Sequence, residues 1–406
     1  MTPDASASRP QVILGVAGGI AAYKAVELLR QLTESGHDVR VIPTQSALAF
    51  VGEPTWAALS GAPVAVSGWD DVHEVPHVRL GQRADLVVVA PATAHLLARA
   101  AHGLADDLLS STLLTARCPV VLAPAMHTEM WEHPATRANV AVLRGRGVVV
   151  IEPAVGRLTG ADSGRGRLPA PEEIARVCRA VLARGSRPPD LVGRRVVVSA
   201  GGTREYLDPV RFLGNRSSGR QGYALARAAA ARGADVVLVA ANASLPDPAG
   251  VQVLTVTTAA QLRDVVLERA RAADVVVMAA AVADYRPLER LTSKRRKTRT
   301  LTVELVENPD VLAELGAVRR PGQVLVGFAA ETDDVLAAGR AKLARKGCDL
   351  LVVNEVGGDG HPTGFEGDSN AATILGSDGT AREVPLGTKD ALADVVWDLV
   401  GERLPR

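Results

Sequence analysis

The sequence has few cysteines and no excess of charge of either sign. Its three cysteines, Cys118, Cys178 and Cys348, lie far apart and form no CxxC pair, so they give no disulfide framework. This use of cysteine is typical of a reducing compartment. Lys and Arg number 46 and Asp and Glu number 45, so the charge balance favours neither nucleic acid nor an anionic membrane as the main partner.

Long apolar runs are also absent. No stretch approaches the roughly 18 apolar residues that a membrane-spanning helix needs. The polar residues MTPDASASRP at the N-terminus contain no apolar core of signal-peptide length. We therefore expect a soluble cytoplasmic protein, and 406 residues, 47% of them apolar, are enough for two or three domains with substantial cores.

Short β-branched runs alternate with longer amphipathic segments along the whole chain. The runs are nearly continuous in Val, Ile and Leu, as a parallel sheet buried on both faces requires, and lie at 11–16, 38–43, 84–90, 119–123, 147–151, 195–200, 235–240, 274–280, 324–328 and 349–353. The charged, proline-containing stretch 184–189 separates two sets of five runs and is typical of a linker. We predict an α/β fold with two doubly wound, Rossmann-like domains, at 1–188 and 189–406.

The stretch 201–222 is an unusually long connection between an apolar run and an alanine-rich helical segment. Ligands bind at such strand-to-helix corners, and a long loop in a compact domain is usually functional. Its glycines, its serines and Asn215 supply hydrogen-bond donors. Its arginines are Arg204, Arg211, Arg216 and Arg220. This combination favours phosphate binding.

Two corners in the N-terminal half indicate a second phosphate site. The segment 15–20, GVAGGI, follows the first strand, and its glycines let backbone amides approach a phosphate. It is not GxGxxG, so a tight packing turn is the alternative. The segment 90–95 ends another buried strand, and the hydroxyls of 110–112 could line the same pocket.

Residues 73–77, HEVPH, match the HExxH pattern of zinc proteases. That pattern works only when a helix places both histidines on one face, and Pro76 opposes a helix through the segment. We therefore expect no zinc site and assign no metal ligands. His77, in a loop before a buried strand, is a candidate for proton transfer, with an ordinary surface histidine as the alternative.

Longer motifs carry a resemblance to known enzymes. GVAGGIAAYK at 15–24, HVRLGQRADLVVVAPATA at 77–94, PAMHTEMW at 124–131 and GRLTGADSGRGRLP at 156–169 resemble flavin-dependent cysteine decarboxylases. GGTREYLDPVRFLGNRSSG at 201–219, AAAVADYR at 279–286, ENPDVL at 307–312 and VGFAAET at 326–332 resemble phosphopantothenate–cysteine ligases. In this order in one chain, they resemble the bifunctional bacterial enzymes of coenzyme A biosynthesis.

For 1–188, the resemblance implies a flavodoxin-like flavoprotein domain that uses FMN to decarboxylate 4′-phospho-N-pantothenoylcysteine to 4′-phosphopantetheine. It places His77 on the family's catalytic histidine. The FMN-binding positions that it implies are Gly15, Ala17, Gly18, Gly19, Ile20, Thr44, Pro91, Ala92, Thr93, Ala94 and Ser110.

The chain departs from the decarboxylase motifs at two places. PAMN reads PAMH here, so His127 stands where an asparagine normally contacts the substrate carboxylate, and an imidazole can donate to that group as well. Many members have a flap cysteine that protonates the enethiolate, whereas this chain has Thr159 there. A threonine hydroxyl is a much weaker acid than a thiol. Another group or water then supplies the proton, or the decarboxylase is impaired.

For 189–406, the resemblance implies a CTP-dependent ligase that activates 4′-phosphopantothenate as an acyl-cytidylate, which the amine of cysteine attacks. Mg²⁺ is an expected participant because carboxylate and triphosphate are both anionic. The implied nucleotide-binding positions are Met278, Ala279, Ala280, Asp284, Lys294, Pro309, Asp310, Val311, Leu312, Phe328, Lys342 and Lys346. Arg211 and Asn215 are expected to act on the acyl intermediate.

Lys294 begins a basic run at 294–297 that has two interpretations. Taken alone, such a run is more often a solvated loop or a nucleic-acid patch. The resemblance favours a mobile clamp in which Lys294 closes on the triphosphate. It also implies a homo-oligomer, a dodecamer with trimeric decarboxylase and dimeric ligase contacts.

Two other functions compete with this one. A ligase that carries an impaired or regulatory flavin-binding domain would fit the missing flap cysteine. The other is an NAD-dependent dehydrogenase with two nucleotide domains. Such an enzyme would need GxGxxG and an acidic residue after it, and this sequence lacks both.

Overall fold

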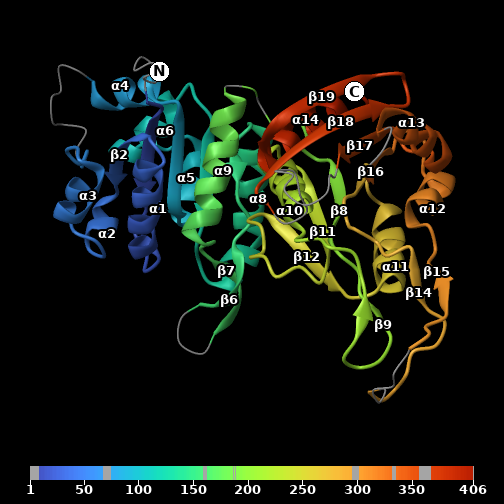
Figure 1. Cartoon of the computed structure of the whole chain (residues 1–406). Coiled ribbons are helices and arrows are strands. Elements are labelled where there is room, and N and C mark those ends of the chain that lie inside the picture. Colours follow the sequence, from blue (N-terminus) through green and yellow to red (C-terminus); the bar gives the residue numbers. More distant parts are fainter. Residues whose placement is uncertain are drawn as a thin grey trace, which may run out of the picture. The chain divides into compact units, whose positions relative to one another are not determined.

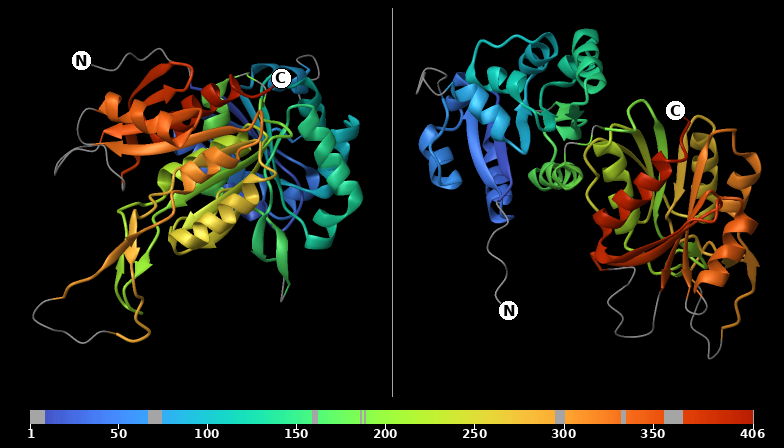
Figure 2. Two further views of the ribbon diagram at one scale, coloured as in Figure 1. Left: turned by 90° about the vertical axis from the view of Figure 1, so that its right-hand side faces the viewer. Right: turned by 90° about the horizontal axis from the view of Figure 1, so that it is seen from above.

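The structure is a computed structural model, and it describes residues 9–66, 75–158, 162–185, 187, 189–294, 301–331, 335–355 and 367–405. The chain forms two compact units, one of Met1–Val192 with Ala230–Gly233 and the other of Gly193–Ala229 with Ala234–Arg406. Each is a central sheet with helices on both faces, so the expected fold class is confirmed (Figures 1 and 2). Among the described helices, none is long and apolar enough to cross a membrane.

The N-terminal unit contains a five-stranded parallel sheet in the order β2-β1-β3-β4-β5. Its strands are β1 (Gln11–Val16), β2 (Asp38–Pro43), β3 (Leu86–Ala92), β4 (Val120–Pro124) and β5 (Val149–Val150). All seven residues of β3 are buried, which explains why its sequence is a continuous apolar run. β5 is shorter than the expected 147–151 because Gly147 has a φ of 84° and cannot continue a strand.

Two layers of helices enclose this sheet. On one face, α1 (Ala22–Glu34) packs against α9 (Pro171–Arg184) and α3 (Glu53–Ser60). The other face carries α5 (Ala94–His102), α6 (Leu108–Thr115) and α8 (Pro134–Gly145), whose apolar side chains join one buried cluster with β3 and β4. The remaining elements are α2 (Gln45–Leu48), α4 (Pro76–Arg83), α7 (Thr128–Glu132) and the antiparallel hairpin β6 (Ala154–Arg157) and β7 (Ser163–Arg167).

The C-terminal unit contains an eight-stranded sheet in the order β12-β11-β8-β13-β16-β17-β18-β19. The expected strands correspond to β8 (Arg195–Gly201), β11 (Asp235–Ala241), β13 (Val275–Met278), β16 (Val324–Glu331) and β17 (Leu350–Glu355), all parallel. Three further strands are not predicted by the apolar runs: β12 (Val251–Val256), β18 (Ser369–Gly376) and β19 (Ala381–Thr388). β18 alternates half-buried and buried positions along most of its length, and β12 and β19 each have a single fully buried residue, so none of the three has a continuous buried apolar run.

Helices cover both faces of the second sheet as well. One layer is α10 (Arg220–Ala231) with α14 (Lys389–Gly401), joined by a hydrogen bond from Trp397 Nε1 to Leu225 O of 2.9 Å. The other layer is α11 (Ala259–Ala270), α12 (Val311–Val318) and α13 (Val335–Lys346), which share a buried cluster with the sheet.

Two small hairpins extend from this unit beyond its sheet (Figures 1 and 2). One is β9 (Glu205–Tyr206) with β10 (Phe212–Leu213), inside the long 201–222 connection. The other is β14 (Tyr285–Pro287) with β15 (Leu305–Glu307). A hydrogen bond from Leu291 N to Leu207 O of 3.0 Å joins the two, and we call them together the arm.

Candidate functional site

In each unit, the order of the strands reverses once beside the first strand. This switch point lies between β1 and β3 in the N-terminal unit and between β8 and β13 in the C-terminal unit. Crevices at the carboxyl ends of these strands bind ligands in open α/β sheets. The predicted glycine corner and the predicted arginine-rich loop each follow a strand at one of these points.

Three loops meet at the first switch point. Ala17 N donates to Pro91 O at 3.2 Å, and Thr44 N donates to Val16 O at 2.9 Å, so the ends of β1, β2 and β3 are held together. A Cβ atom on Gly18 would lie 2.3 Å from the Cβ of Ser46. Only glycine fits this close approach.

The corner after β1 offers unused hydrogen-bond donors. Within the residues that the structure describes, the N–H groups of Gly18, Gly19 and Ile20 donate to no other group of the chain. They lie just before α1, where the helix dipole also favours an anion. Nearby, burial and the positive charge of Arg167 lower the pKa of Lys24. A bound anion here would stabilise the charged form of Lys24.

Thr44 and Thr93 come to the same place from the other two loops. Each begins a helix: Thr44 Oγ1 accepts from Ala47 N at 3.2 Å, and Thr93 Oγ1 accepts from Leu96 N at 3.3 Å. Capping uses only acceptor capacity, so both hydroxyl hydrogens can still be donated. These predicted positions are therefore brought together with 15–20, 91–92 and Ala94.

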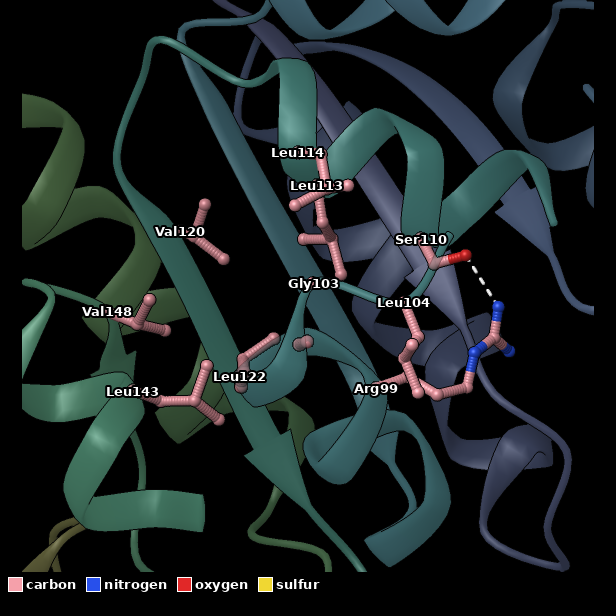
Figure 3. Close-up of a pocket in the computed structure, with 11 residues that line it drawn as sticks. Arg99, Gly103, Leu104, Ser110, Leu113, Leu114, Val120, Leu122, Leu143 and Val148 are labelled. Atoms are coloured by element: carbon pink, nitrogen blue, oxygen red, sulfur yellow. Dashed lines mark hydrogen bonds between the residues drawn. The ribbon is translucent and has the colours of Figure 1, made fainter. Parts of the chain in front are cut away.

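Ser110 lies in a separate, buried polar cluster. It forms a capping box with Asp107 and accepts a hydrogen bond of 2.6 Å from Arg99 Nη2, toward which it points in Figure 3. Burial opposes ionisation of Asp107, but hydrogen bonds from Arg99 and Ser110 outweigh it and lower the pKa of Asp107. Apolar residues around Arg99 and Ser110 line a cavity of about 70 Å³. Ser110 thus shapes the end of α6 as well as being a predicted ligand position.

The loop from β4 to α7 carries His127 and joins the same edge of the sheet. Ala125 N donates to Ala92 O at 3.1 Å, which ties it to the end of β3. The β6–β7 hairpin packs onto this loop: Met126 N donates to Gly166 O at 2.9 Å. A Cβ atom on Gly164 would lie 2.2 Å from Thr128 Oγ1, so this contact also requires glycine.

His77 lies in α4, which corrects the expected loop. The helix begins at Pro76, where a missing N–H costs nothing because first-turn amides have no partner within a helix. Thr115 Oγ1 donates to His77 O at 2.7 Å and joins α4 to α6. No hydrogen bond or ion pair links His77 to His127 in the described part of the chain.

Two positions singled out from the sequence lie outside the described residues. These are Thr159 in the flap and the His73–Glu74 half of the HEVPH pattern. Across the described ranges, no group of three or more His, Cys, Asp or Glu side chains could hold a metal ion.

At the second switch point, two loops are joined through their backbones. Thr203 N donates to Ala281 O at 3.2 Å, and Ala281 N donates to Gly201 O at 2.8 Å. Thr203 Oγ1 accepts from Ala283 N at 2.9 Å. The connection 201–222 and the segment after β13 therefore form one rigid floor.

A hollow of about 230 Å³ lies on this floor. Its lining is polar and carries two arginines: Gly202, Thr203, Arg204, Phe212, Gly214, Asn215, Arg216, Ser217 and Asn242. Asn215 Nδ2 donates to Val282 O at 3.1 Å, which fixes the amide at the hollow. The guanidinium of Arg204 stacks over Phe212 at 4.7 Å. Such a lining suits an anionic ligand.

Arg211, in contrast, is not part of this lining. Its Nε and Nη2 donate to Oδ2 of the fully buried Asp208 at 2.9 and 2.5 Å, at the turn between β9 and β10. In the sequence, Arg204, Arg211 and Arg216 belong to one cationic loop. Only the fold separates the arginines at the hollow from the one at the hairpin turn.

Several predicted nucleotide positions lie at the neighbouring ends of β13 and β16. Asn308 N donates to Asp284 O at 2.8 Å, and a Cβ atom on Gly327 would lie 2.7 Å from Leu312, beside Phe328. Asp310 caps α12 and forms an ion pair with Lys346 of α13. Burial opposes ionisation of Asp310, but the hydrogen bonds from Lys346 and from Ala313 N prevail and lower the pKa of Asp310.

The other nucleotide positions lie on three segments. Met278 is buried at the end of β13 and continues into 279–280. Lys342 is half-buried on α13. Lys294 is exposed after β14, and no contact in the described ranges joins it to the other positions.

A flavodoxin-type sheet with an open amide corner, followed by a second sheet with a cationic hollow, defines a flavoprotein domain fused to a nucleotide-binding domain. Comparison with known proteins agrees. Residues 2–183 match the family described as Flavoprotein, and residues 191–404 match the DNA/pantothenate metabolism flavoprotein C-terminal domain.

Full-length relatives extend the match. The chain is 60% identical over 403 residues to the coenzyme A biosynthesis bifunctional protein CoaBC of Mycobacterium tuberculosis, covering 96% of each chain. It is 42% identical over 395 residues to CoaBC of Bacillus subtilis, again with 96% of each covered. A solved structure of the C-terminal domain of CoaBC is 34% identical, with a TM-score of 0.45 over 53% of this chain and 97% of that one.

The chain therefore belongs to the CoaBC family of bifunctional coenzyme A biosynthesis proteins. It is an enzyme that combines a phosphopantothenate–cysteine ligase with a phosphopantothenoylcysteine decarboxylase, and its N-terminal domain is of the flavoprotein family. None of these matches favours a dehydrogenase or a purely regulatory flavin domain.

Proposed function

We propose that residues 189–406 ligate cysteine to 4′-phosphopantothenate with CTP and that residues 1–188 then decarboxylate the product with FMN. The observation that carries this proposal is the pair of anion-binding features, one at the switch point of each sheet. Each lies where its sheet would bind a ligand. Both substrates carry a phosphate, so each site needs an anion-binding feature.

FMN fits the corner after β1. The free amides of 18–20 would hold its phosphate, and Thr44 and Thr93 would donate their hydroxyl hydrogens. The predicted positions Gly15, Ala17, 91–92 and Ala94 would surround it, and Ser110 would support the corner from its own buried cluster with Asp107 and Arg99. When bound, FMN can accept a hydride and return it, which permits loss of carbon dioxide without net oxidation.

The histidines have separate tasks in this proposal. His77 moves the proton of the substrate thiol, since an imidazole can exchange protons near neutral pH. His127 donates a hydrogen bond to the carboxylate that will leave. The β6–β7 hairpin, packed on the His127 loop, limits the access of water to that carboxylate.

In the ligase site, the cationic hollow binds an anionic end of 4′-phosphopantothenate. Arg204 and Arg216 neutralise its charge, and Asn215 acts on the acyl-cytidylate. Arg211, which binds Asp208 at the hairpin turn, would have to leave that carboxylate to act on the same intermediate. CTP lies over 278–280, Asp284, 309–312, Phe328, Lys342 and Lys346, with Lys294 closing on the triphosphate. Mg²⁺ accompanies the triphosphate, as it does in most nucleotide-dependent transfers.

The arm supports a dimer of ligase domains. Val210, Phe212, Tyr285, Leu288 and Leu305 on the arm are each more than 40% exposed. Exposed apolar side chains gathered on one projection are typical of an interface. We combine this dimer with trimers of the decarboxylase domain in a dodecamer, and the mass of the particle by light scattering tests that assembly.

One assay tests the paired activities. The purified full-length protein is incubated with 4′-phosphopantothenate, CTP, Mg²⁺ and cysteine, and the release of CMP and of carbon dioxide is followed. We expect both products in equal amounts when FMN is bound. CMP without carbon dioxide would contradict the decarboxylase assignment, and activity with ATP equal to that with CTP would contradict the choice of nucleotide.

A further inference from the structure

His127 faces a carboxylate from the flap hairpin. Its Nδ1 lies 4.0 Å from Oδ2 of Asp162, the residue before β7. The packing of Gly164 and Gly166 on 126–128 fixes the two segments against each other. The side chain of His127 is 45% exposed, so its ring can still reach a ligand.

One polar group beside this contact lacks a hydrogen-bond partner. Thr128 Oγ1 is buried and forms no hydrogen bond within the described residues. A buried hydroxyl without a partner costs free energy, and such groups gather at functional sites. The contact between the His127 loop and the hairpin therefore has the polar character of a functional site as well as a packing role.

No thiol of the chain can serve as an acid at this place. Cys118 lies before β4, at the opposite end of that strand from His127, and burial raises its pKa to about 11. Cys178 is buried in α9, where desolvation raises its pKa to about 12. Cys348 is buried within the C-terminal unit, where desolvation raises its pKa to about 11, and these three are all the cysteines of the chain.

The decarboxylation nevertheless requires an acid. When the bond between the carbon and the carboxylate breaks, its electron pair stays on the substrate as an enethiolate, and the carbon that lost carbon dioxide must gain a proton. The side chain that held the carboxylate then lies next to the carbon that must be protonated. An asparagine amide cannot release a proton under these conditions, whereas an imidazolium can.

We propose that His127 is the proton donor to this carbon and that Asp162 is a positioning residue for its imidazolium. The Nε2–H bond breaks, a C–H bond forms at the carbon, and the neutral imidazole regains a proton from water. Asp162 beside Nδ1 orients the ring so that Nε2 is left for the substrate. This inference rests on the proposed assignment of the His127 loop to the substrate carboxylate.

The test compares H127N and D162N with E129Q in the full-length enzyme loaded with FMN. H127N restores an amide that can hold the carboxylate but cannot donate the proton. We expect it to lower the ratio of thiol product to oxidised enethiol by about 100-fold or more, with flavin left reduced. D162N should lower that ratio about tenfold. E129Q removes an exposed carboxylate from α7, the short helix that begins directly after His127, and should leave the ratio unchanged.

Product identity is measured by mass spectrometry and flavin reduction by absorbance. A substrate analogue with a hydroxyl in place of the thiol cannot be oxidised, so its calorimetric titration measures binding alone; H127N and D162N should bind it nearly as tightly as wild type. A wild-type product ratio in H127N overturns the proposal, and so does an H127N enzyme whose flavin is never reduced. A wild-type protein that neither binds FMN nor releases carbon dioxide would instead refute the proposed function.

Discussion

The two switch-point corners have the same position in their sheets but offer an anion different groups. In the N-terminal unit, the corner between β1 and α1 is short, and its donors are backbone amides of 18–20. In the C-terminal unit, the connection between β8 and α10 includes a hairpin, and its donors are the side chains of Arg204, Asn215 and Arg216.

This difference explains how one architecture serves two chemistries. Amides at a helix N-terminus are neutral and cannot move, so they suit a cofactor that stays bound. Arginine side chains carry full charge, so they can neutralise anionic substrates that must meet and react. The length of the corner, more than the sheet, therefore decides whether a site offers backbone amides or charged side chains to an anion.

The largest effect is expected from filling the amide corner. Gly18→Val should lower FMN affinity at least about 100-fold, because its side chain would collide with Ser46 and displace the loop. The ligase activity should persist, since it belongs to the other unit. Flavin content after purification and a fluorescence titration measure this. Gly145→Ala, where nothing lies within 4 Å of the added Cβ, is the control; normal flavin binding by Gly18→Val would disprove the amide cradle.

Removing a cation from the hollow should have the next largest effect. Arg216→Ala should raise the KM for 4′-phosphopantothenate by about 10- to 100-fold, since a hydrogen bond to a charged group contributes about 1.5–3 kcal/mol. Steady-state release of CMP measures this, with decarboxylation of added substrate as the internal reference. Arg382→Ala, an exposed arginine of β19, should behave as wild type. An unchanged KM for Arg216→Ala would remove the distinction between the two corners.

Lys294→Gln should slow formation of the acyl-cytidylate about tenfold. The neutral side chain cannot stabilise the charge of the triphosphate. Rapid-quench measurement of the first turnover separates this step from the attack by cysteine. If the first turnover keeps its wild-type rate, Lys294 is not a clamp.

The smallest effect concerns the buried cluster beside the first corner. Asp107→Asn should destabilise the N-terminal unit by about 1–2 kcal/mol at pH 7, because Arg99 loses a charged partner. The folded-state pKa of Asp107 is lowered, so its contribution is full above the unfolded pKa of about 4 and is lost as pH falls through the folded pKa. Calorimetry should show a Tm about 2–8 °C lower at pH 7. A difference in Tm between Asp107→Asn and wild type that is as large at pH 3 as at pH 7 would contradict this account.

Much of the fold could be predicted from particular segments. β3 was recognisable because a strand buried on both faces must be apolar at every position, and the same held for β8 and β16. β18 and β19 do not follow this rule, because β18 buries alternate residues along most of its length and β19 buries only Val384. Pro76 predicts no helix at His77 if proline is only a helix breaker, but proline is favoured in the first turn, where it stands in α4.

The sequence by itself determined the two α/β domains, the positions of the two candidate phosphate corners and, through its motifs, the family. These depend on local composition and spacing, which survive in a linear string. Only the tertiary structure decided that Arg216 lines the hollow while Arg211 binds Asp208, and that Asp162 meets His127 from another segment. Such partners are chosen by the packing of loops distant in sequence, because a loop side chain turns toward whichever charge the fold brings near it.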